Sequence, residues 1–119
     1  MLTLTEKDYC DYDTCVALKE LGYPLIAKEV RYEDKAVFVP GVLLYSAQKW
    51  LREEKTIGVF VSGFKNGYTF WVNNLLNGDT LYQGFFDNQT GEKYKSYEEA
   101  LSEGIKEAVK ILKNGLDSN

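Results

Sequence analysis

Two short turn signals divide an apolar, aromatic-rich stretch of the chain into three segments. Asn66-Gly67 lies between the first two segments, and Asn77-Gly78-Asp79 lies between the second and the third. Asn-Gly readily supplies the two positive-φ residues of a type I′ hairpin turn. The stretch is therefore predicted to form a three-stranded antiparallel meander. The expected strands are Thr56–Phe64, Tyr68–Leu76 and Thr80–Phe86.

The turns also assign faces, because side chains alternate between the two faces of a strand. If Asn66-Gly67 is a two-residue loop, Val61 pairs with Val72. One face is then apolar almost throughout and is predicted to face the core. It carries Ile57, Val59, Val61, Tyr68, Phe70, Val72 and Leu76, with Leu81, Gln83 and Phe85 if the second loop also has two residues. A three-residue second loop would exchange the faces of the third strand.

The opposite face is also rich in apolar side chains, although a solvated face should be mostly polar. It carries Phe60, Phe64, Trp71, Leu75, Tyr82 and Phe86, interrupted by Gly58, Ser62, Asn73 and Gly84. Such a patch exceeds the roughly few hundred Å² that monomers usually expose, and Trp and Tyr often anchor interfaces. We therefore expect the N-terminal helix and hairpin, a second copy or a foreign protein to cover it. Its six apolar residues are the candidate interaction site.

Two helices are predicted to flank the meander. One spans about Leu44–Glu54, and the other spans about Tyr97–Lys113. Their apolar stripes are Ala47, Trp50 and Leu51 in the first, and Leu101, Ile105, Ala108, Val109 and Leu112 in the second. The second helix opens on Ser96-Tyr97-Glu98-Glu99, a capping box in which Ser and Glu side chains satisfy free backbone N–H groups. Its acidic start and basic end suit the helix dipole.

The N-terminal third is predicted to contain a short helix and a hairpin. Asp11 or Asp13 can cap a helix that ends near Leu21. Ala27–Tyr32 and Ala36–Val39 are interpreted as an irregular hairpin. The sequence as a whole predicts one α+β domain over residues 1–119, in which helices cover an antiparallel meander.

Composition argues against several classes of function. The chain has no histidine, and so lacks the commonest general base and metal ligand. Its net charge of −4 disfavours binding to nucleic-acid phosphates. The start lacks the basic and apolar regions of a signal peptide, and no run approaches the ~20 apolar residues of a membrane span. We therefore expect a cytoplasmic protein with no membrane partner.

No residue set clearly carries chemistry. Cys10 and Cys15 are poorly spaced for a metal site and are predicted to be reduced thiols. Asp11-Tyr12-Asp13-Thr14 matches the D-x-D-T nucleophile motif of haloacid-dehalogenase-type phosphatases. That motif needs a preceding buried strand and a larger fold, so a helix cap is the favoured interpretation. No catalytic, metal-binding or cofactor-binding residue is predicted.

A nucleic-acid-binding αβββα module is the first alternative. The order of elements over residues 44–113 is that of double-stranded-RNA-binding domains, and Gly67–Val72 loosely matches the aromatic strand of RNA-recognition domains. However, Glu98 and Glu99 would repel RNA at the start of the last helix, and Phe70 is assigned to the core. A second alternative is an enzyme that uses carboxylates or tyrosines as its acid and base.

Several segments together resemble a known group of sequences. They are Leu18–Tyr23, Ala47–Glu54, Tyr68–Val72, Ser96–Leu101 and Gly104–Ala108. In these segments the chain resembles short uncharacterised proteins of gut Bacteroidetes and their phage-like or mobile elements. The resemblance implies a gene neighbourhood, but it supplies no activity or catalytic residues. The resulting expectation is a small non-enzymatic protein-interaction or accessory domain.

Overall fold

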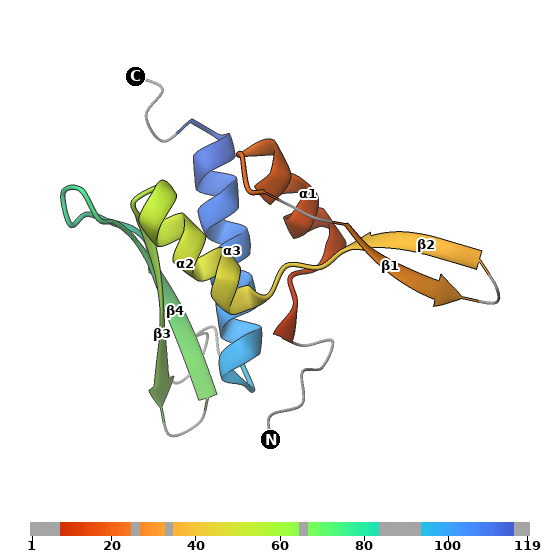
Figure 1. The fold of residues 1–119 in the computed structure, drawn as a ribbon. Helices are drawn as coiled ribbons and strands as arrows, with labels where there is room; N and C mark the ends of the chain where they lie inside the picture. The colour runs from red at the N-terminus through yellow and green to blue at the C-terminus, as the bar shows by residue number, and fades with distance from the viewer. Residues whose placement is uncertain (1–7, 25–26, 33–34, 65–66, 84–93, 116–119) are drawn as a thin grey trace.

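The computed structural model describes residues 8–24, 27–32, 35–64, 67–83 and 94–115. Within these ranges the protein has three helices and two antiparallel sheets, which confirms the predicted α+β class (Figure 1). In chain order the elements are α1 (Tyr12–Glu20), β1 (Ala27–Tyr32), β2 (Lys35–Pro40), α2 (Leu44–Glu54), β3 (Ile57–Phe64), β4 (Gly67–Asn74), β5 (Thr80–Gln83) and α3 (Tyr97–Lys113).

The first hairpin of the meander is shifted by two residues from the predicted register. Phe64 pairs with Gly67, and Val61 pairs with Phe70 rather than with Val72. Gly67 therefore belongs to β4, so the prediction of a two-residue Asn66-Gly67 loop was wrong. Asn66 itself lies outside the described residues. A shift of two preserves the period-2 alternation, and the predicted faces of β3 and β4 are therefore unchanged.

The side chains of the third strand point to the opposite faces of the sheet from those predicted. Residues 75–79 connect β4 to β5, and the pairing changes register between Val72 and Asn73. Tyr82 pairs with Val72 and its ring stacks on Phe70 at a centroid distance of 5.1 Å. Tyr82 therefore lies on the core face, and its prediction on the opposite face was wrong. Gln83 pairs with Trp71 and so leaves the core face.

The chain returns beside β4 after β5 has ended. The backbones of Tyr68 and Tyr94 exchange two hydrogen bonds of 2.9 Å, as an isolated antiparallel bridge. Tyr94 then leads into α3. The side-chain oxygen of Ser96 accepts the N–H of Glu99 at 3.1 Å, as predicted for the capping box. The Glu99 carboxylate, in contrast, accepts the N–H of Lys95 at 3.2 Å.

Helices α2 and α3 lie on the same side of the sheet formed by β3, β4 and β5 (Figure 1). The core between the helices and the sheet buries Leu51, Ile57, Phe70, Val72, Leu101 and Ile105. Gln48 of α2 donates its side-chain amide to the carbonyl of Val59 at 2.8 Å. Because β3 is an edge strand, this bond satisfies a polar group that a sheet edge would otherwise leave open.

Helix α1 packs on α3, with Cys15 and Leu18 fully buried. Asp11 is its N-cap, and its carboxylate accepts the N–H of Thr14 at 2.8 Å. The predicted hairpin is confirmed as β1 and β2, in which Val30 pairs with Val37. It forms a separate two-stranded sheet that projects from the body on the far side of α1 from the meander (Figure 1).

Candidate functional site

The side of the meander that faces away from the helices, here called the outer face, is the surface that the sequence singled out. Among the described residues it carries Gly58, Phe60, Ser62, Gly67, Thr69, Trp71, Asn73 and Gln83 from the strands, together with Leu75, which lies against Gly58. Phe60 is 46% exposed and Leu75 is 41% exposed, whereas Trp71 is partly buried. Two large apolar side chains are thus open to solvent on a sheet surface.

Phe60 and Leu75 lie together over a glycine. A β-carbon placed on Gly58 would lie 2.6 Å from Cε2 of Phe60 and 2.9 Å from Cδ2 of Leu75. The missing side chain at Gly58 therefore lets the ring of Phe60 and the methyl group of Leu75 fold down onto the strand. The result is a low, continuous apolar surface over one end of β3.

Not all six predicted residues join this surface. The structure brings together Phe60, Trp71 and Leu75, while Tyr82 lies on the core face. The side chain of Phe64 and the whole of Phe86 lie outside the described part of the structure. Tyr82 was misplaced because the sequence did not reveal the register change between Val72 and Asn73.

The N-terminal elements do not cover the outer face, contrary to the first of the three expected arrangements. Helix α1 contacts α3, and β2 contacts α1. Figure 1 shows both on the helical side of the sheet, with the hairpin directed away from it. The other two expected covers, a second copy and a foreign protein, stay predictions.

Two polar atoms on this face are buried without a hydrogen-bond partner in the described part of the structure. They are Oγ1 of Thr69, a residue that is 1% exposed, and Oδ1 of Asn73. Leaving such a group unpaired costs about 1–3 kcal/mol. Asn73 pairs with Gly58, so its orphaned oxygen lies beside the surface that Phe60 and Leu75 close over.

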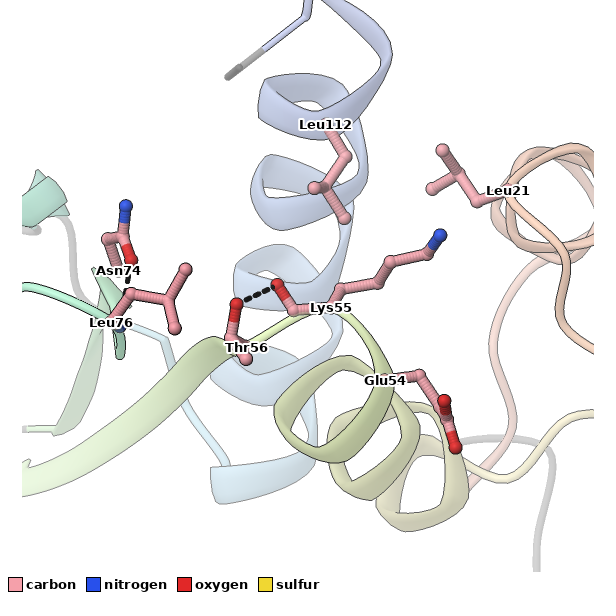
Figure 2. Close-up of a pocket in the computed structure, with 7 residues that line it drawn as sticks. All are labelled: Leu21, Glu54, Lys55, Thr56, Asn74, Leu76 and Leu112. Atoms are coloured by element: carbon pink, nitrogen blue, oxygen red, sulfur yellow. Dashed lines mark hydrogen bonds between the residues drawn. The ribbon is translucent and has the colours of Figure 1, made fainter.

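A groove of about 500 Å³ lies where the C-terminal ends of the helices meet the start of β3 and the end of β4 (Figure 2). It is lined by Leu21, Glu54, Lys55, Thr56, Asn74, Leu76 and Leu112. The last turns of α1, α2 and α3 all contribute to it, as does the end of β4. Leu76 is 79% exposed at its margin. This groove could not be predicted from the sequence, because its lining comes from four separate segments of the chain.

The backbone at the centre of the groove is strained. Thr56 has φ = +53°, a left-handed conformation that β-branched residues rarely adopt. Its hydroxyl donates to the carbonyl of Lys55 at 2.6 Å (Figure 2). The Lys55 ammonium lies 5.5 Å from the ring centroid of Trp50. Lys55 thus places a positive charge where three helix C-termini, each with partial negative charge, come together.

The acidic group with a shifted pKa in the described residues is Asp11. Its partial burial opposes ionisation, but the hydrogen bond from Thr14 and the ammonium of Lys106, 3.1 Å away, outweigh burial and lower the pKa. Asp11 therefore acts as a helix cap, as the interpretation of the D-x-D-T motif required. It does not line the groove.

The two cysteines are free thiols and both are buried. Burial raises the pKa of the Cys10 thiol to about 12 and also raises the pKa of Cys15. The Cys15 sulfur lies 3.7 Å from the carbonyl oxygen of Cys10. Such thiols are poor nucleophiles, because the thiolate is the reactive form.

The described residues hold no grouped metal ligands and no membrane-spanning helix. Among the described residues, no three His, Cys, Asp or Glu side chains are grouped as metal ligands would be. None of the helices in those ranges is long and apolar enough to cross a bilayer.

The aromatic side chains that resemble those of RNA-binding domains pack inside the protein. Phe70, whose position in the strand resembles that of a base-stacking ring, is 2% exposed beneath α3. Tyr68 packs edge-on against Tyr97 at 6.2 Å. Glu98 and Glu99 occupy the first turn of α3, where RNA-binding domains carry basic residues.

Comparison with known proteins leaves the site to be judged by its geometry. No protein-family model matches the chain, and no curated protein or solved structure is significantly similar to it.

Proposed function

We propose that the protein is a small non-enzymatic interaction domain that docks other protein surfaces on its outer face. The observation that carries the proposal is the exposure of Phe60, 46%, and Leu75, 41%, on the side of the meander opposite the helices. Neighbouring exposed apolar side chains of this kind are a feature of protein-binding surfaces. The partly buried Trp71 supplies the type of side chain that most often anchors an interface.

The composition of the face supports docking to protein rather than to nucleic acid. Its described residues carry no positive charge, whereas phosphate binding depends on Lys and Arg. Depletion of charge with enrichment of aromatic residues is the pattern of an interface core. The groove offers a weaker alternative site, because the positively charged side chain of Lys55 already lies in it. We expect this activity in the cytoplasm, and the link to phage-like or mobile elements stays a prediction.

Site-specific photo-cross-linking tests the proposal in living cells. Phe60 is replaced by a photoreactive phenylalanine analogue, a substitution that keeps an aromatic ring at the position. Tyr12 is the matched control, because it is an aromatic residue, 67% exposed, on the helical side. Irradiation is expected to give a discrete covalent protein adduct from position 60 and none from position 12.

The outcomes separate docking from general stickiness. An adduct that forms at position 60 and disappears in a Leu75→Ser background would support the outer face as the docking surface. If position 60 gives no adduct, or if positions 60 and 12 give the same set, the proposed function is wrong. The mass of the adduct then identifies the partner.

A further inference from the structure

The groove at the C-terminal ends of the helices differs from the outer face in carrying a charged side chain. We propose that it is a binding site for a small amphipathic carboxylate, a ligand with an aliphatic chain of medium length that ends in a carboxylate group. Lys55 pairs with the carboxylate, while Leu76 and Leu112 contact the chain. This activity is separate from the docking proposed above, because no described residue lines both the groove and the outer face.

The groove has the size and the lining of a small-ligand site. Its volume of about 500 Å³ lies within the roughly 300–1,000 Å³ of such sites, which combine apolar walls with a few polar groups. Leu21, Leu76 and Leu112 come from separate segments of the chain, and Leu76 is 79% exposed. A hydrocarbon chain laid against Leu76 removes apolar surface from water on both partners, which favours binding.

The ammonium of Lys55 is available to a negatively charged ligand. The ion pairs among the described residues join other groups, as Lys113 and Glu20 do at 2.7 Å, and none of them includes Lys55. Lys55 extends toward Leu21, whereas the carboxylate of the neighbouring Glu54 points in another direction (Figure 2). The lysine that makes the groove a poor surface for docking a protein therefore suits a ligand with a carboxylate.

Aromatic packing holds this ammonium in place before a ligand arrives. It lies 5.5 Å from the ring centroid of Trp50, and that ring packs edge-on against Tyr23 at 5.3 Å. A cation over the face of an indole is attracted by the ring electrons. Because Lys55 is already positioned, less side-chain entropy is lost when it pairs with a carboxylate.

Helix C-termini carry partial negative charge, which by itself would repel a carboxylate. Two of the carbonyl groups at these ends are already bonded within the chain. In α1 the carbonyl of Leu18 accepts the N–H of Tyr23 at 2.9 Å, and in α2 the carbonyl of Lys55 accepts the hydroxyl of Thr56 at 2.6 Å. These bonds satisfy the oxygens that a helix end otherwise leaves open. The full charge of the Lys55 ammonium then determines the preference of the groove.

The strained backbone of Thr56 is a separate indication of a ligand site. Its φ of +53° occurs at the end of a helix, where glycine is the usual residue. Strained residues of this kind cluster at ligand sites and switch regions, where the surrounding structure holds them in place. Here the left-handed residue takes the chain from α2 directly into β3, and it lines the groove beside Lys55 (Figure 2).

The donors in the groove match a carboxylate better than a phosphate. Phosphate sites gather arginine forks or the several free N–H groups of a helix N-terminus. The groove instead lies at helix C-termini, and its basic side chain among the described residues is Lys55. A single ammonium matches the single charge of a carboxylate, and the leucines match the aliphatic chain.

Isothermal titration calorimetry of the full chain with decanoate is the first test. A dissociation constant on the order of 100 μM is expected for a ligand of this size in an open groove. Decylammonium has the same chain and the opposite charge, and it should bind at least about tenfold more weakly. Acetate has the carboxylate without the chain, and it should give no measurable heat of binding.

Substitutions at Lys55 test the role of its charge. Lys55→Met keeps the aliphatic stem and should raise the dissociation constant of decanoate about tenfold, as loss of a charged hydrogen bond does. Lys110→Met is the matched control, because Lys110 is an exposed lysine in the last turn of α3 that does not line the groove. Lys55→Glu should reverse the preference and bind decylammonium more tightly than the wild type does. This gain of binding could not come from misfolding.

Backbone amide NMR spectra locate the bound ligand. Decanoate should shift the signals of Thr56 and Leu76 in the groove and leave that of Phe60 on the outer face unchanged. These shifts, together with weaker binding to Lys55→Met, support the inference. It is overturned if decanoate does not bind at about 1 mM, if Lys55→Met binds it as well as the wild type, or if the shifts centre on Phe60. The photo-cross-link from position 60 is a different measurement, so the proposed function can fail or hold independently.

Discussion

Gly104 of α3 lies so close to Val59 of β3 that a β-carbon added at Gly104 would stand 2.6 Å from Cγ1 of Val59. The same atom would lie 3.1 Å from Cδ1 of Phe70. Both neighbours are core side chains with almost no exposure. Only a glycine at this position allows the helix to rest directly on the sheet.

Gly104→Ala is therefore expected to destabilise the protein by about 1–3 kcal/mol, as overpacking of a close-packed core does. This loss should exceed the gain of about 1 kcal/mol that alanine offers over glycine in a helix. Urea denaturation measures the change. Gly58→Ala is the matched control, because the nearest atoms to its added methyl group are the far ends of Phe60 and Leu75, which are exposed side chains that can move aside. Equal losses in the two variants would contradict the assigned packing.

Thr56→Gly is expected to raise the free energy of unfolding by about 1 kcal/mol, since a β-branched residue at positive φ stores about 1–3 kcal/mol of strain. Thr56→Val should lower the free energy of unfolding. Valine keeps the same strain and loses the hydroxyl that donates to the carbonyl of Lys55 at 2.6 Å. Thermal melting of both variants checks the prediction. A Gly variant that melts below the Val variant would show that Thr56 is not strained in solution.

The sequence was most informative where a local signal determines local structure. Capping residues located the starts of α1 and α3, and the alternation of apolar residues assigned the faces of β3 and β4 correctly. A strand register that differed by two residues did not disturb these faces, because side-chain direction repeats every two residues. For the same reason the prediction of Phe60, Trp71 and Leu75 on one surface was correct.

The failures concern features that depend on contacts between distant segments. Tyr82 was misplaced because a register change in the β4–β5 pairing reverses the third strand, and no turn residue announces it. The groove was missed because Leu21, Lys55 and Leu112 meet only after folding. The left-handed backbone of Thr56 was also missed, since threonine is an unfavourable residue for that conformation and gives no signal of it.

Stability is expected to fall at acid pH through Asp11. The pKa of its carboxyl lies below the usual 3.8 in the folded protein, where partial burial opposes ionisation but Thr14 and Lys106 favour it more. The stabilising contribution of the ionised group is therefore complete above about pH 4 and is lost as the pH falls through the lower folded pKa. Unfolding free energies between pH 7 and pH 2 measure this loss.

Substitution separates the two roles of Asp11. At pH 7 Asp11→Ala should cost about 1 kcal/mol, because it removes the helix cap, and Asp11→Asn should cost less, because asparagine still caps. The ion pair with Lys106 is exposed to solvent and should add little. The difference between wild type and Asp11→Asn should vanish at pH 2. A difference that persists there would mean that ionisation of Asp11 is not its cause.

The thiols of Cys10 and Cys15 should be almost inert in the folded protein. With a pKa of about 12, only about 1 in 10,000 Cys10 thiols is ionised at pH 8, against about a tenth at the unshifted value of 9.0. Ionisation alone therefore lowers reactivity about a thousandfold, and burial of the sulfur adds to this. Ellman's reagent is expected to detect no fast-reacting thiol in the native protein and both thiols in urea. Rapid reaction of the native protein would show that the segment from Cys10 to Cys15 opens locally.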